Sequence, residues 1–107
     1  MDLDLDDPIE YVCAVIIETH RRKRADYATD EEPFKNFEVV ARMMELEGYD
    51  RLSDCLTMVI RKVGRIINLR GSEPENESLL DSYKDLAVYG VLLYAMASEE
   101  GGWEELE

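Results

Sequence analysis

The sequence predicts an all-α protein, an antiparallel four-helix bundle that forms a homodimer. Apolar residues recur at helical spacing in four segments, which proline or glycine separates, and no segment alternates apolar and polar residues as a strand does. The 107 residues suit a single domain. We expect this domain to span residues 8–98, between acidic tails at residues 1–7 and 99–107.

The first two helices are predicted from their start and stop signals. Pro8 follows Asp7 and suits the first helical turn, so a helix should run from there to about Arg24. Its stripe consists of Val12, Val15, Ile16, Thr19 and Lys23. After a polar loop, Pro33 can open a short second helix that Gly48 ends.

The third helix is predicted to start at a cap formed by Asp50 or Ser53, to run to about Arg70 and to close at Gly71. Its predicted apolar stripe consists of Leu56, Val59, Ile60, Val63, Ile66 and Ile67. A fourth helix should run from Glu77 to about Ser98. Residues 86–97 are apolar almost all round, which indicates burial on every side and therefore self-association, most simply a symmetric dimer.

The net charge of -13 comes mainly from the two ends of the chain. Residues 1–10 and 99–107 carry five acids each and no base, which leaves 15 acids against 12 bases in the other 88 residues. This distribution argues against non-specific nucleic-acid binding, which needs a positive surface. The acidic N-terminus is unlike a signal peptide, no apolar run is as long as a membrane span, and Cys13 and Cys55 resemble buried free thiols. We therefore expect a cytoplasmic protein.

A row of carboxylates opens the fourth predicted helix. Glu77, Asp81 and Asp85 are four residues apart and share one helix face. A divalent cation would remove their mutual repulsion, because hard cations take oxygen ligands. Two alternatives remain open: an acidic first turn that complements the helix dipole, and ion pairs of Asp81 and Asp85 with basic residues across the bundle.

Basic and aromatic residues supply candidate contacts to a nucleotide. Lys62 and Arg65 lie three apart, away from the apolar stripe of the third helix, and can hold a phosphate or form a solvated basic face. Lys23 continues the stripe of the first helix, so its ammonium needs a carboxylate, a ligand or water. Three aromatic residues can stack on a base or anchor the core: Tyr27, Phe34 and Phe37. There is no glycine-rich phosphate loop, and His20 has no partner pattern for catalysis or metal binding.

These segments together resemble the small, MazG-like, nucleotide-modification-associated phage proteins of the all-α nucleoside triphosphate pyrophosphatase superfamily. The resemblance covers about residues 10–97 and rests on Lys23, Asp26-Tyr27, Pro33-Phe34, Asn36-Phe37, Lys62, Arg65, Asn76-Glu77-Ser78, Asp81, Asp85-Leu86-Ala87 and Tyr89. It implies a dimerising helical bundle and, in active members, Mg²⁺-dependent cleavage of a nucleoside triphosphate to the monophosphate and pyrophosphate.

The chain departs from active MazG-like enzymes at both acidic motifs. Residues 61–65 are Arg-Lys-Val-Gly-Arg where those enzymes have Glu-Glu-x-x-Glu, and the later Glu-x-x-Asp is matched only at Asp85, because Ser82 precedes it. Glu77 and Asp81 are the candidate substitutes. Asp81 and Asp85 are therefore the predicted catalytic residues, and they would hold Mg²⁺ together with Glu77.

Three functions follow as hypotheses. The first is a Mg²⁺-dependent pyrophosphohydrolase in which Lys62, Arg65 and Lys23 neutralise the phosphates, Tyr27, Phe34 or Phe37 flanks the base, and Asn36 or Asn76 hydrogen-bonds it. The second is a nucleotide-binding protein that sequesters its ligand without cleavage, acting against host defence. The third is an acidic protein-interaction module.

Overall fold

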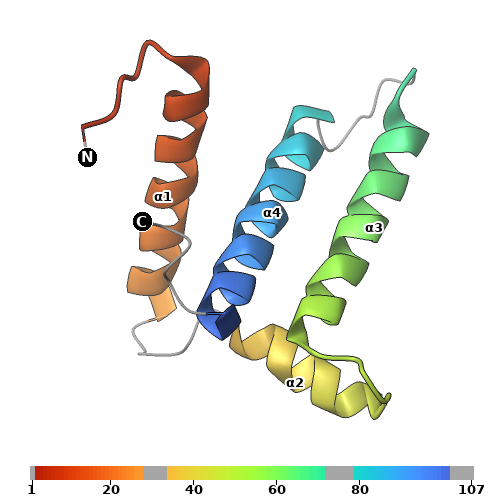
Figure 1. Ribbon diagram of the computed structural model, residues 1–107. Helices are drawn as coiled ribbons and strands as arrows, with labels where there is room; N and C mark the ends of the chain where they lie inside the picture. The colour runs from red at the N-terminus through yellow and green to blue at the C-terminus, as the bar shows by residue number, and fades with distance from the viewer. Residues whose placement is uncertain (1, 28–33, 72–78, 102–107) are drawn as a thin grey trace. The chain divides into compact units, whose positions relative to one another are not determined.

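The computed structural model describes residues 2–27, 34–71 and 79–101 (Figure 1). These residues form four helices and no strand, which confirms the all-α prediction: α1 (Pro8–Tyr27), α2 (Lys35–Met44), α3 (Arg51–Leu69) and α4 (Leu79–Gly101). Contacts divide the chain into two compact units, an N-terminal unit of residues 1–31 and a C-terminal unit of residues 32–107. None of the described helices is long and apolar enough to cross a bilayer.

Helix α1 is the body of the N-terminal unit. It starts at Pro8 as predicted, and the Asp7 carboxylate caps it by accepting two backbone N–H groups, at 2.8 and 3.2 Å. It continues to Tyr27, three residues beyond the predicted end. Cys13, which the sequence predicted to be buried, is exposed on this helix, whereas Cys55 of α3 is buried.

Local signals also set the ends of α2 and α3. Helix α2 ends at Met44, because Glu45 adopts a left-handed conformation (φ 51°), so the predicted end at Gly48 is one turn too late. The predicted Asp50 cap is confirmed: its carboxylate accepts the backbone N–H of Ser53 at 2.9 Å. Gly71, with φ 84°, follows the end of α3 as predicted.

Helices α3 and α4 pack antiparallel in the C-terminal unit, and α2 packs against α3 (Figure 1). Three contacts fix the antiparallel direction: Arg51 with Met96, the Cys55 thiol with the Tyr89 carbonyl at 3.7 Å, and Lys62 with Asp85. The core of this unit contains Phe34, Cys55 and Met96, with Phe37, Leu52, Tyr89, Leu92, Leu93 and Ala95 around them. The interior is therefore shared by all three helices.

The predicted apolar stripe of α3 proves to be two faces. Ile66 is buried and Val59 is half-buried, on the same side of α3 as the contacts with α4. Leu56, Ile60, Val63 and Ile67 form a second face and are 49, 70, 39 and 64% exposed. The sequence prediction merged the two faces because both are apolar and adjacent on the helix. Lys62, predicted to lie away from the apolar stripe, instead lies on the side that contacts α4.

Helix α4 has an exposed apolar face, and its C-terminal end differs from the prediction. Val91 and Tyr94 are 51 and 57% exposed, and the expected covering of this half of the helix by a second copy stays a prediction. The helix also continues to Gly101, so Glu99 and Glu100 belong to its last turns and not to an acidic tail.

Candidate functional site

The central contact among the predicted site residues joins α3 to α4. Lys62 Nζ lies 2.9 Å from Asp85 Oδ2, and the side chains are 18 and 47% exposed. The lysine side chain is thus mostly buried, while the aspartate side chain is about half exposed to water. The ion pair that the sequence left open as an alternative to metal binding is present for this pair of residues.

The antiparallel register places two more predicted residues one helical turn away from the contact between Lys62 and Asp85. One turn beyond Lys62, α3 carries Arg65, and one turn before Asp85, α4 carries Asp81. Both are exposed, and both take part in interactions. We call the four residues Lys62, Arg65, Asp81 and Asp85 the polar surface of α3 and α4.

Ser82 lies between the two aspartates and is fully buried. Its hydroxyl has no hydrogen-bond partner among the residues that the structure describes. An unpaired buried hydroxyl costs on the order of 1–3 kcal/mol relative to a paired one. A longer acidic side chain would not fit this enclosed place without rearrangement.

The other predicted residues are scattered. Asn76 and Glu77 lie outside the described residues, and so does the side chain of Tyr27. Lys23 is exposed on α1, in the N-terminal unit, and Asn36 is exposed on the first turn of α2. Phe34 is 6% exposed and Phe37 packs against it in the core, which is the structural alternative considered for both rings.

No group of three or more acidic, histidine or cysteine side chains converges as a metal site among the residues that the structure describes. Asp81 and Asp85 remain as two carboxylates one turn apart on α4. Mg²⁺ in nucleotide sites is commonly held by one or two carboxylates together with phosphate oxygens and water. Two aspartates therefore fit a metal that arrives with a triphosphate better than one that resides in the protein.

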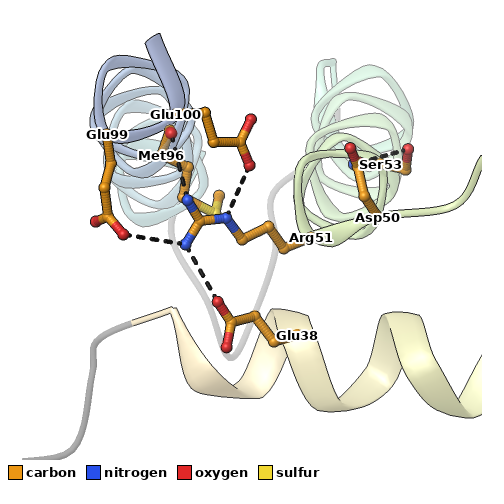
Figure 2. A network of polar contacts seen from close by, with 7 residues as sticks. All are labelled: Glu38, Asp50, Arg51, Ser53, Met96, Glu99 and Glu100. Carbon is orange, nitrogen blue, oxygen red and sulfur yellow. Dashed lines mark hydrogen bonds and ion pairs between the residues drawn. The ribbon is translucent and has the colours of Figure 1, made fainter. Parts of the chain in front are cut away.

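A second polar cluster, which the sequence did not predict, surrounds Arg51 (Figure 2). Its guanidinium contacts Glu100 at 3.0 Å, Glu38 at 3.2 Å and Glu99 at 3.6 Å. It also donates to the Met96 carbonyl at 3.5 Å. We call Arg51, Glu38, Glu99 and Glu100 the arginine cluster, and it links α2, α3 and α4.

Burial and charge act oppositely on Arg51. Its side chain is only 11% exposed and lies over the Phe34 ring, 5.3 Å from the ring centre. Burial lowers the pKa of Arg51, but the Glu100 hydrogen bond and the charges of the glutamates outweigh it, so the pKa is raised. The guanidinium therefore stays charged. No sequence signal singled out Arg51, because Glu99 and Glu100, two of its three partners, were assigned to a tail.

An open depression of about 350 Å³ lies beside the arginine cluster. It is lined by Glu38, Ala41, Arg42, Tyr49, Asp50, Arg51 and Glu100. Hydrogen bonds from the backbone and the hydroxyl of Ser53 lower the pKa of Asp50, so this carboxylate is ionised at neutral pH. Glu38 and Glu100 pair with Arg51, and Asp50 caps α3, which suits a structural junction better than a catalytic centre.

The chain shows no match to protein-family models, to curated proteins or to solved structures.

Proposed function

We propose that the protein handles nucleotides and binds the phosphate chain of a nucleoside triphosphate at the polar surface of α3 and α4. The contact between Lys62 and Asp85 carries this proposal. It supplies a lysine side chain that is only 18% exposed and that pairs with a carboxylate whose side chain is 47% exposed. Phosphate oxygens can replace such a partner, because the ion pair is only partly desolvated.

Each residue of the polar surface has a distinct role in this proposal. Lys62 would meet a phosphate as a compact charge, and Arg65 would grip phosphate oxygens through its planar fork. Asp85, released from Lys62, would join Asp81 in holding Mg²⁺, which would neutralise the phosphates and act as a Lewis acid. Lys23, Asn36 and Asn76 remain proposed ligand contacts on the resemblance alone.

Two candidate functions differ in whether the bound nucleotide is cleaved. Pyrophosphohydrolysis is supported by the spacing of Asp81 and Asp85 on one face of α4. Binding without cleavage is supported by the ion pair of Asp85 with Lys62 and by the buried Ser82 where active MazG-like enzymes have glutamate. The second candidate needs fewer converging carboxylates, so the geometry favours it.

The test is to incubate the protein with nucleoside triphosphates and cyclic nucleotides, with Mg²⁺ or EDTA, and to analyse bound and free nucleotides by mass spectrometry. An intact bound nucleotide supports sequestration, and Mg²⁺-dependent monophosphate and pyrophosphate support hydrolysis. Lys62→Met should weaken binding by about tenfold or more, because a charge-assisted hydrogen bond is lost. Arg22→Met is the matched control, since Arg22 is exposed on α1. Equal binding by both variants would exclude the polar surface as the site.

The same proposal includes self-association and the arrangement of all four helices in one antiparallel bundle. Leu80, Val91 and Tyr94 support it, because they are 75, 51 and 57% exposed on the side of α4 opposite Met96. That much apolar surface on one helix favours coverage by another helix. A cytoplasmic location is proposed on the sequence alone.

A further inference from the structure

The exposed face of α3 forms a narrow apolar stripe. It consists of Leu56, Ile60, Val63 and Ile67, and we call it the α3 stripe. The exposed fractions are 49, 70, 39 and 64%. Because its residues are spaced by four, three and four, they lie on one face of the helix. This face is about a quarter turn from the side that contacts α4. Four adjacent large apolar side chains at coiled-coil spacing indicate a helix that packs against another helix.

We propose that a second copy of this chain docks on the α3 stripe, with its own α3 antiparallel and a twofold axis between Ile60 and Val63. The spacing of four, three and four residues is the same from the N-terminal end of α3 as from its C-terminal end. Antiparallel pairing about that axis therefore places Leu56 opposite Ile67 of the other copy and Ile60 opposite Val63. A twofold interface requires this self-complementarity, because each residue must meet its counterpart reciprocally.

Charge at the two ends of α3 supports the same orientation. Asp50 caps the N-terminal end of the helix, and Arg70 follows its C-terminal end. Antiparallel pairing brings the Arg70 of each copy toward the Asp50 of the other, and it also opposes the two helix dipoles favourably. The α3 stripe itself contains no charged residue, so a net charge of -13 per chain is not concentrated at the interface.

The proposed interface is independent of the proposed nucleotide site. Arg65 lies about half a turn from the centre of the α3 stripe, since helical residues advance by about 100° each. Docking on the stripe therefore leaves the polar surface of α3 and α4 open. The sequence predicted self-association from α4, whereas this inference assigns the contact to α3.

Two complementary charge variants test both the surface and the register. Sedimentation equilibrium should show the unaltered chain as a dimer. Ile60→Glu and Val63→Lys should each weaken dimerisation by about 100-fold or more, because each buries an unpaired charge. An equimolar mixture of the two variants should form a heterodimer, since the new carboxylate then faces the new ammonium across the axis. Met43→Glu is the control, because Met43 is 75% exposed on α2.

Circular dichroism should show that each variant remains helical. A monomeric unaltered chain would overturn the proposal and would point to coverage of the stripe within one chain. Dimers that survive Ile60→Glu would overturn the choice of surface. Loss of dimers in both single variants without recovery in the mixture would overturn the antiparallel register.

Discussion

Replacing Arg51 with methionine tests whether the arginine cluster stabilises the C-terminal unit. The change removes the charge and keeps an apolar side chain over Phe34. Arg51 is 11% exposed, while Glu38, Glu99 and Glu100 are 30, 44 and 44% exposed. Each pair is therefore stronger than a surface ion pair, worth about 0.2–1 kcal/mol, and weaker than a fully buried one, whose disruption costs about 3–5 kcal/mol. We expect a total loss of about 2 kcal/mol, including repulsion among the three glutamates.

Thermal unfolding followed by circular dichroism measures this loss. For a domain of this size, 2 kcal/mol corresponds to a decrease in Tm of roughly 10 °C. Arg22→Met is the matched control, because Arg22 pairs with Glu18 at 3.1 Å at the surface, where the Arg22 side chain is 77% exposed and the Glu18 side chain is 59% exposed. The control should change Tm by less than about 2 °C. Equal effects of Arg51→Met and Arg22→Met would refute the view that enclosure strengthens the arginine cluster.

Three further predictions concern caps and thiols. Asp50→Ala should destabilise the fold by about 1 kcal/mol, whereas Asp50→Asn should not, because asparagine also caps helices. The pKa of Asp50 is lowered, so the stabilisation from its charge is present above pH 3.8 and is lost as pH falls through the folded pKa. Chemical denaturation at several pH values measures both effects. Burial, and secondarily the charge of Asp54, raises the pKa of Cys55 above 9.0. The contribution of the Cys55 thiol to the free energy of unfolding is therefore present below pH 9 and is lost as pH rises through the folded pKa, by at most about 1.4 kcal/mol per pH unit. Cys55→Ala should remove this pH dependence and Cys13→Ala should not. A thiol reagent should label exposed Cys13 rapidly and buried Cys55 only on unfolding; rapid labelling of both would contradict the described core.

Helix starts were predictable because their signals are local. Asp7 with Pro8 and Asp50 with Ser53 satisfy backbone groups only two or three residues away, and the structure confirms both caps. Helix ends were harder to predict. The last turns of α4 contain Glu99 and Glu100, whose pairing with Arg51 depends on a helix 49 residues earlier in the chain.

Periodicity could not assign faces on α3. A helix with apolar residues over a wide arc shows one broad pattern, whether it contacts one neighbour or two. Only the register with α4 separates Ile66, which is buried, from Ile67, which is 64% exposed. The same register explains Lys62: its spacing to Arg65 was visible in the sequence, but its contact with Asp85 required the partner helix.

The arginine cluster also bears on the order of events during synthesis. Arg51 and Glu100 are 49 residues apart, and Glu38 is 13 residues before Arg51. A nascent chain that ends before residue 99 contains Arg51 and Glu38 but neither acidic partner from α4. The junction of α2 and α3 can therefore reach its final charge balance only after almost the whole of the described chain has left the ribosome. The contact of Arg51 with Glu100 closes a longer loop than the Cys55–Tyr89 and Lys62–Asp85 contacts, 49 residues against 34 and 23, and therefore has the largest entropic cost of closure of the three.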